Sequence, residues 1–363
     1  MQPLNTYKQN DPTLPDQVTS YSDKIRATIH AILRFFRVLL LICMLLWSVG
    51  ALTYFPVIPS WLGRIAGLAL LLMPWWIAKW VDWPEQRRSY IFLTTVGVML
   101  LWLLIPPSSN RDWDEYHGRI AVPEITASSV SIKDVRSFRY TSTGHASPPN
   151  FTKAYLDLEI PLDRIEGMDI AVADLTAWRG PAHTMISFSY RVDGQLRYIN
   201  VSAETRREKG ESYSALRGLF KHYELVYVIA DEQDALELRH TYGEKVRLYP
   251  VSLPKHTIRQ IFVDVMNRAR KLQSQPEFYH TITNNCTTQI LKHISRVAEN
   301  DISILNWRII MASHSDELLF GYGMVDPTLS ARVPRDHFLT NGRAERFVEG
   351  KDYSAHIRPQ HIP

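Results

Sequence analysis

Residues 182–204, AHTMISFSYRVDGQLRYINVSAE, form two segments of alternating side chains around a central Asp193-Gly194 pair. Asp-Gly between two such segments is a strong signal for a β-hairpin with a two-residue turn. If these residues form the turn, one face of the hairpin is apolar, because Ile186 then pairs with Val201. The sequence therefore predicts a sheet that packs its core against this face.

The opposite face of the predicted hairpin carries polar side chains. His183 lies directly opposite Glu204 and Ser187 opposite Asn200, and the Cβ atoms of such pairs are about 5 Å apart. A carboxylate beside an imidazole fixes the tautomer of the ring and stabilises the imidazolium. The pair is therefore a candidate general base. The alternative is a surface pair on a solvated face, and a β-bulge would break the pairing.

The candidate nucleophile is Cys286, in the run HTITNNCTTQ (280–289). The other cysteine, Cys43, lies in an apolar run. A helix is predicted over about 285–298, with Cys286 in its first turn, and the N–H groups at a helix start favour the thiolate. Cys286 and Ile290 share the face that packs on the predicted sheet. The alternative is an inert buried thiol, but polar neighbours on both sides of Cys286 favour a nucleophile.

Other histidines compete with His183 as the base. His280 precedes the helix of Cys286, and His293 lies on the same helix face two turns away, too far for direct contact. The competing residues are His145, His222, His280, His293 and His314.

The N-terminal region contains three apolar segments, 38–55, 61–81 and 91–105. A helix needs about 20 apolar residues to cross a bilayer, so we expect the short third segment to extend at both ends. A cleaved signal peptide is the alternative. It fits poorly, because the charged region before the first segment is too long and two more apolar segments follow. The sequence predicts three transmembrane helices.

Lysine and arginine residues set the predicted topology. Arg34 and Arg37, with further cations upstream, precede the first apolar segment, and Arg87 and Arg88 lie between the second and third. Because positively charged flanks stay in the cytoplasm, three crossings place the rest of the chain in the periplasm. The expected inner-membrane protein then has a cytoplasmic tail, a three-helix membrane region and a periplasmic domain, which are residues 1–37, 38–106 and 107–363.

The region 107–363 mixes strand and helix signals, which predicts the α+β class: an antiparallel sheet with helices packed on one face. The net charge of +4 is too small to indicate a nucleic-acid partner. The sequence also has no phosphate-binding loop and no Cys/His cluster at metal-ligand spacing, so no metal or cofactor is expected. The clearest predicted elements are strands at 130–140, 168–172 and 224–229 and helices at 231–242 and 255–273.

Several segments around these residues resemble a known family, the bacterial periplasmic domain named after the N-terminal domain of Lnb, a lipoprotein N-acyltransferase. The order of His before Cys is also similar to the permuted papain-like group of NlpC/P60 and lecithin-retinol acyltransferase proteins, which implies that fold. The matching segments lie roughly between residues 110 and 300, at 110–113, 182–188, 202–211, 218–225, 231–232 and 283–288.

The resemblance implies a thioester mechanism with Cys286 as nucleophile, His183 as base and Glu204 as the residue that orients the ring. The expected function is a membrane-anchored periplasmic acyltransferase that moves an acyl chain from a phospholipid to an amine such as a lipoprotein N-terminus. The alternatives are a periplasmic cysteine hydrolase (cell-wall amidase, peptidase or lipid deacylase) and a non-catalytic membrane scaffold. Candidate oxyanion or substrate residues are Asn285, Arg206 and Ser187.

Overall fold

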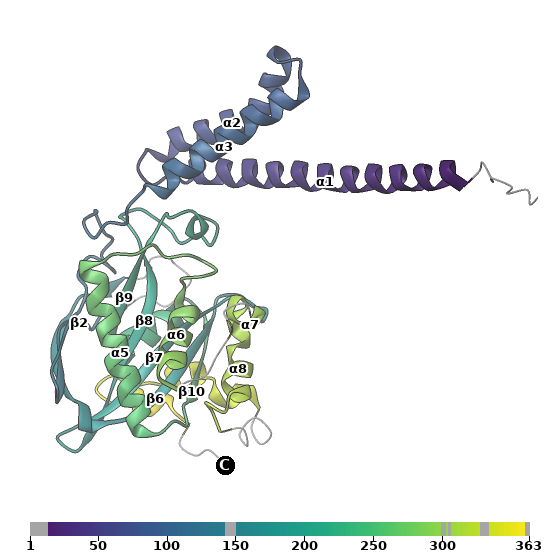
Figure 1. Cartoon of the computed structure of the whole chain (residues 1–363). Helices are drawn as coiled ribbons and strands as arrows, with labels where there is room; N and C mark the ends of the chain where they lie inside the picture. Colours follow the sequence, from purple (N-terminus) through teal and green to yellow (C-terminus); the bar gives the residue numbers. More distant parts are fainter. Residues whose placement is uncertain (1–13, 142–149, 299–302, 304–305, 327–333, 360–363) are drawn as a thin grey trace, which may run out of the picture. The chain divides into compact units, whose positions relative to one another are not determined.

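The computed structural model describes residues 14–141, 150–298, 303, 306–326 and 334–359 (Figure 1). The chain divides into two compact units, Met1–Pro106 and Pro107–Pro363. His145, one of the competing histidines, lies outside the described residues.

The N-terminal unit consists of helices α1 (Leu14–Thr53), α2 (Ser60–Trp80) and α3 (Pro84–Leu103). Two of them are long and apolar enough to cross a membrane, over Asp23–Thr53 and Ser60–Trp80. These two helices agree with the first two predicted spans, although α1 extends far beyond the apolar segment.

The prediction of a third transmembrane helix is wrong by the same criterion. α3 begins at Pro84, so its first turns carry Glu85, Arg87 and Arg88 rather than apolar side chains. The apolar remainder of α3 is therefore shorter than the roughly 20 residues that a crossing needs. The predicted tail, residues 1–37, includes the first part of α1, which is helical from Leu14 onward.

The C-terminal unit is built on an eight-stranded sheet in the order β1-β2-β9-β8-β7-β6-β10, with β5 paired to β2. Its strands pair antiparallel except β2 with β9, which confirms the predicted α+β class with a largely antiparallel sheet. Strands β3 and β4 pair separately. The strands are β1 (Val122–Ile125), β2 (Ser129–Arg136), β3 (Arg139–Tyr140), β4 (Phe151–Thr152), β5 (Tyr155–Pro161), β6 (Ile165–Asp174), β7 (Ala182–Val192), β8 (Gln195–Arg206), β9 (Glu224–Asp231) and β10 (Lys245–Pro250).

Strands β7 and β8 form the hairpin predicted at 182–204, in the predicted register, with Met185 opposite Ser202. Asp193 and Gly194 have φ angles of 50° and 76°, the positive values that a type I′ turn requires. Because a slip by one residue would exchange the two faces of a strand, this turn fixes which side chains meet.

Helices α4 and α5 form where local signals in the sequence predict them. Asp231 caps α4 by accepting a hydrogen bond from the backbone N of Asp234 at 2.8 Å, and the apolar stripe of α5 is buried from Ile258 to Leu272. The helices are α4 (Glu232–Thr241), α5 (Lys255–Ser274), α6 (Cys286–Ala298), α7 (Trp307–Ile310), α8 (Ser315–Gly321), α10 (Asn341–Ala344) and α11 (Tyr353–Ile357), with 3₁₀ turns at Leu162–Arg164, Arg217–Leu219, Ala312–His314 and Arg335–Phe338.

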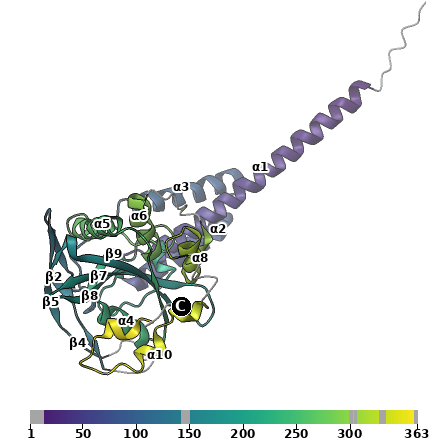
Figure 2. The same cartoon turned by 90° about the horizontal axis from the view of Figure 1, so that it is seen from below.

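Helices cover both faces of the sheet, whereas the sequence predicted helices on one face (Figure 2). On one side α5, α6 and α8 pack on the main core, which includes Ile186 and Val201. On the other side α4 and α11 cover a second apolar cluster that includes Met185. The polar face of the hairpin is therefore also buried, and Ser187 and Asn200 are inaccessible to solvent.

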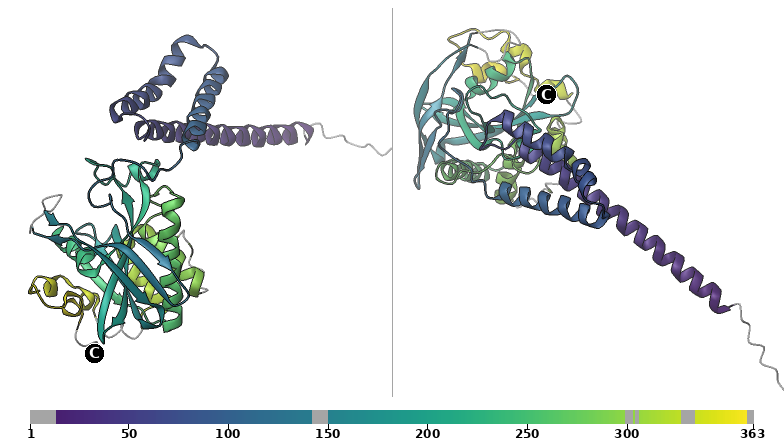
Figure 3. Two further views of the ribbon diagram at one scale, coloured as in Figure 1. Left: turned by 90° about the vertical axis from the view of Figure 1, so that its left-hand side faces the viewer. Right: turned by 90° about the horizontal axis from the view of Figure 1, so that it is seen from above.

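A C-terminal segment, residues 334–359, covers part of the second face (yellow in Figure 3). Its Arg358 lies 2.6 Å from Asp169 on β6 and 2.6 Å from Glu232 at the start of α4. The guanidinium also lies over the ring of Tyr198, 3.6 Å from the ring centroid. Because a buried cation needs partners on all sides, this arrangement ties α4 to the sheet.

Candidate active site

A cavity of about 460 Å³ is lined by residues of β7, β8, α4 and the start of α6. It brings together the three side chains predicted to act as a unit, Cys286, His183 and Glu204. The remaining lining residues are Tyr116, His117, Arg136, Leu175, Ala182, Ala203, Thr205, Arg207, Ser212, Tyr213, Leu238, Arg239, Tyr242, Glu244 and Tyr279.

The imidazole of His183 is held by a serine that sequence reasoning missed. Nε2 lies 2.6 Å from Ser202 Oγ, and this hydroxyl donates a hydrogen bond to Glu204 Oε1 at 3.0 Å. The direct separation between Nε2 and Glu204 Oε1 is 3.5 Å. Since the hydroxyl donates its proton to the carboxylate, it accepts the proton of Nε2, which leaves Nδ1 for the thiol.

Ser202 could have been found from the hairpin pattern, because residues i and i+2 of a strand share a face and Ser202 precedes Glu204 by two positions. The alternative interpretation of His183 and Glu204, a pair on a solvated surface, is wrong. Their side chains are only 11% and 18% exposed, because α4 covers this side of the hairpin.

Glu204 is kept ionised mainly by an arginine from outside the hairpin. Oε1 accepts a hydrogen bond from Arg239 Nη2 at 2.8 Å, and Oε2 lies 3.9 Å from His117 Nε2. Burial alone would raise the pKa of Glu204, but Arg239 and His183 hold this pKa well below its ordinary value. No sequence signal connects Arg239 on α4 or His117, which precedes β1, to the hairpin.

Cys286 is the first residue of α6 and is buried. Burial would raise the pKa of the thiol, but the adjacent His183 and hydrogen bonds from His183 and Thr184 lower this pKa to about 6. Burial and Arg239 act to lower the pKa of His183, but the thiolate and Glu204 raise it to about 9. The site therefore favours a thiolate–imidazolium pair near neutral pH.

Asn285, predicted to contribute to an oxyanion site, is instead the cap of α6. Its Oδ1 accepts a hydrogen bond from the backbone N of Thr288 at 2.9 Å, and its Nδ2 donates to Thr281 O at 2.7 Å. Both side-chain groups are thus occupied. The cap accepts the hydrogen bond of the third amide of the helix, that of Thr288. The amides of Cys286 and Thr287, at the first two positions, have no acceptor within the helix.

Arg206 and Ser187 do not line the cavity. The Nε of Arg206 donates to His117 O at 3.2 Å, and the guanidinium lies 4.2 Å from the ring centroid of Trp113. Burial lowers the pKa of Arg206 to about 10. Ser187 accepts a hydrogen bond from Asn200 Nδ2 at 2.9 Å. The structure gives both residues packing roles, and the neighbouring Arg207 lines the cavity instead.

The competing histidines that the structure describes have other partners. His280 Nδ1 lies 3.0 Å from Thr283 Oγ1, in the turn before α6. His222 lies 2.9 Å from Glu211 and His314 lies 2.9 Å from Glu317. None of these histidines lines the cavity of Cys286.

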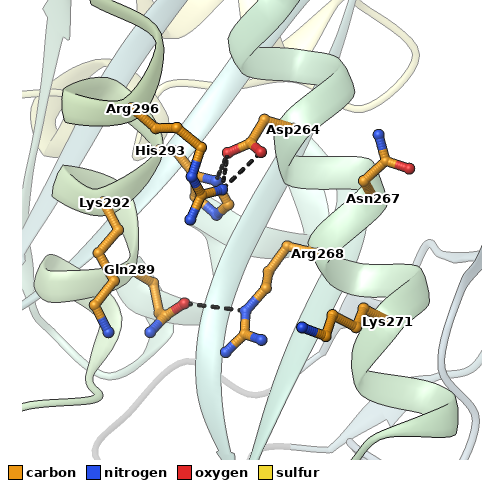
Figure 4. Close-up of a pocket in the computed structure, with 8 residues that line it drawn as sticks. All are labelled: Asp264, Asn267, Arg268, Lys271, Gln289, Lys292, His293 and Arg296. Atoms are coloured by element: carbon orange, nitrogen blue, oxygen red, sulfur yellow. Dashed lines mark hydrogen bonds and ion pairs between the residues drawn. The ribbon is translucent and has the colours of Figure 1, made fainter. Parts of the chain in front are cut away.

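His293 belongs to a separate groove of about 430 Å³ between α5 and α6 (Figure 4). Its Nδ1 lies 2.6 Å from Asp264 Oδ2 and its Nε2 2.7 Å from the hydroxyl of Tyr227. Arg296 also contacts Asp264, at 2.7 Å. Both ring nitrogens of His293 are therefore occupied, and burial lowers its pKa.

Two tyrosines were also missed. Tyr213 and Tyr279 line the cavity together with Cys286 and hydrogen-bond each other. Among the described residues, no group of three or more His, Cys, Asp or Glu side chains is placed to hold a metal ion.

Residues 151–313 match the family described as the Lnb N-terminal periplasmic domain. The match includes His183, Ser202, Glu204 and Cys286, and it confirms the resemblance inferred from the sequence. No curated protein and no solved structure matches the chain. The permuted papain-like arrangement stays a prediction.

Proposed function

We propose that this chain, whose residues 151–313 carry an Lnb-type periplasmic domain, is a membrane-anchored acyltransferase that works through a thioester on Cys286. The observation that supports the proposal is one cavity that joins a low-pKa thiol to an imidazole held through Ser202 and Glu204. Activated thiols with an oriented histidine are suited to acyl transfer.

In the first step the Cys286 thiolate attacks the ester carbonyl of a phospholipid. A C–S bond forms, the C–O bond to the glycerol breaks, and the His183 imidazolium gives its proton to the leaving alkoxide. The amides of Cys286 and Thr287, in the first turn of α6, stabilise the negative oxygen of the tetrahedral intermediate. The products are an acyl-thioester and a lysophospholipid.

In the second step an amine, such as a lipoprotein N-terminus, attacks the thioester. The C–S bond breaks, and neutral His183 accepts the proton that the amine loses. The Cys286 thiolate and the imidazolium are then restored, so neither step needs a cofactor. Ser202 and Glu204 hold the ring in one tautomer during both proton transfers.

The proposed location is the inner membrane, with the domain in the periplasm and α1 and α2 as anchors. A cytoplasmic N-terminus and a periplasmic domain require an odd number of crossings, so the orientation predicted from the basic residues conflicts with two spans. The periplasmic location has the support of the family description. Alkaline phosphatase fused after Pro363 should be active, and a fusion active only as a cytoplasmic reporter would overturn this location.

The chemistry is tested with the full-length protein in detergent and a phospholipid with a labelled acyl chain. Mass spectrometry should find the acyl group on Cys286, hydroxylamine should release it, and an added N-terminal peptide amine should accept it. Cys43→Ser is the matched control and should keep the adduct. A Cys286→Ala variant that carries as much protein-bound acyl group as the wild type would contradict the mechanism. Release of free fatty acid or cleavage of peptidoglycan stems, without transfer, would assign the site to a hydrolase.

A further inference from the structure

The cavity of Cys286 contains three arginines, and two of them are neutralised by nearby carboxylates. Arg136 is buried and lies 2.9 Å from Asp234, and Arg239 lies 2.8 Å from Glu204. These two guanidiniums are positioned within the protein and have little capacity to bind a further anion.

Arg207 differs from the other two arginines. It follows β8, and its side chain is 25% exposed. The closest acid is Asp114, 3.4 Å from Arg207 Nε, and this Nε makes no hydrogen bond with any described residue. Asp114 is itself shared, because its Oδ1 lies 2.8 Å from His117 Nδ1. Arg207 is therefore the least neutralised arginine of the cavity.

Two tyrosines accompany Arg207 in this part of the cavity. Tyr116 and Tyr242 both line it, and the charge of Arg207 acts on the hydroxyl groups of both. Burial raises the pKa of each tyrosine despite this charge, so both hydroxyl groups keep their protons. A guanidinium with neighbouring phenol O–H groups supplies hydrogen-bond donors to an anion.

We infer that Arg207, together with Tyr242 and Tyr116, binds the phosphodiester of a phospholipid in the cavity of Cys286; in the proposed reaction this phospholipid is the acyl donor. Arginine matches phosphate oxygens through two parallel N–H donors. The cavity, about 460 Å³, has a volume suited to a headgroup with its adjoining glycerol esters rather than to whole acyl chains. The inference rests on the proposed function for the reaction, but the binding itself is independent of turnover.

Binding is tested with full-length Cys286→Ala protein in detergent, which cannot turn over. Glycerophosphoethanolamine, a phosphodiester without acyl chains, is titrated by calorimetry. We expect saturable binding that Arg207→Gln weakens about 10- to 100-fold, the scale of a charge-assisted hydrogen-bond pair, and that Arg207→Lys weakens less. The matched control is Arg191→Gln, because Arg191 is 44% exposed on the hairpin, pairs with Glu166 and does not line the cavity.

A parallel titration with inorganic phosphate separates a lipid headgroup from a free anion. Stronger binding of the diester than of phosphate supports the inference. Binding of phosphate alone, or equal loss of diester binding in Arg191→Gln and Arg207→Gln, overturns it.

Kinetics separates the inference from the proposed function. Arg207→Gln should lower kcat/KM with a phospholipid donor and leave the rate with diacylglycerol of the same chains unchanged. If wild type forms no thioester but the diester binds through Arg207, the proposed function fails and the inference stands. If the thioester forms and both donors are unaffected by Arg207→Gln, the inference fails and the function stands.

Discussion

Two buried histidines lie beside carboxylates near α6, and their pKa values move in opposite directions. His293 has both ring nitrogens occupied, by Asp264 and Tyr227, and burial lowers its pKa. His183 also lies near a carboxylate, but a thiol is its second neighbour, and its pKa rises to about 9. A histidine and a carboxylate in contact are thus insufficient to mark a catalytic base. The second partner of the ring determines whether the imidazolium is favoured in a buried site.

The largest expected effect is the loss of the nucleophile. Cys286→Ala should abolish the acyl-thioester and all transfer, because no other described thiol lines the cavity. Cys286→Ser should also be severely impaired, since a hydroxyl is a much weaker nucleophile than a thiolate. Transfer of a labelled acyl chain is the measurement. Transfer by Cys286→Ala at the wild-type rate would show that Cys286 is not the nucleophile.

Removing the two histidines in turn tests the comparison directly. His183→Ala should lower transfer at least ~10²-fold, the usual scale for loss of a general base, whereas His293→Ala should leave the activity of the folded fraction unchanged. Circular dichroism and thermal unfolding determine how much of each variant is folded. Equal losses of activity per folded molecule would contradict distinct roles.

The pH dependence should reflect the thiolate–imidazolium pair. The pKa of Cys286 is lowered to about 6 and that of His183 raised to about 9, so both groups are charged between these values. Activity should fall about tenfold per pH unit below 6, where the thiol is protonated, and again above 9, where the ring loses its proton. Iodoacetamide alkylation should titrate near pH 6 in wild type and at a higher pH in His183→Ala. An unshifted midpoint would disprove the pairing.

Ser202 should have a smaller effect than His183. Ser202→Ala removes the contact with Nε2 and the link to Glu204, which we expect to cost about tenfold in rate, near the lower range for a charge-assisted hydrogen bond. Ser187→Ala is the matched control, since Ser187 is on the same hairpin face outside the cavity. A Ser202→Ala variant with the wild-type rate and thiol pKa would show that Glu204 orients the ring alone.

The smallest effect concerns the His293 groove. Arg296 is 58% exposed, so Arg296→Ala should change the free energy of unfolding by less than about 1 kcal/mol and leave transfer unchanged. Thermal unfolding and the transfer assay provide the two measurements. A loss of transfer greater than the loss of folded protein would extend the active site into this groove.

Local patterns in the sequence predicted the part of the site that one supersecondary element contains. The turn at Asp193-Gly194 determined the register, and the register placed His183 near Glu204. The sequence also placed Cys286 at the start of a helix, and the structure adds that Asn285 is the cap of this helix. Short-range rules of this kind act between neighbours in the chain, so they can be read without the tertiary fold.

The rest of the site depends on contacts between distant segments. Arg239 reaches Glu204 from α4, and no periodicity shows that α4 covers the polar face of the hairpin. The choice between Arg206 and Arg207 depends on the end of a strand, where alternation stops being a guide. The third apolar segment is extended at its N-terminal end, but the added turns carry charged side chains, so the helix does not meet the criterion for a membrane span.

The ion pairs of Arg358 determine when the site can be completed during synthesis of the chain. This guanidinium holds Glu232, the first residue of α4, and α4 carries the arginine that binds Glu204. Ribosomes make residues 353–358 after every other part of the active site. We therefore expect a growing polypeptide to fix the contact between Arg239 and Glu204 only after Arg358 has been made and has paired with Glu232.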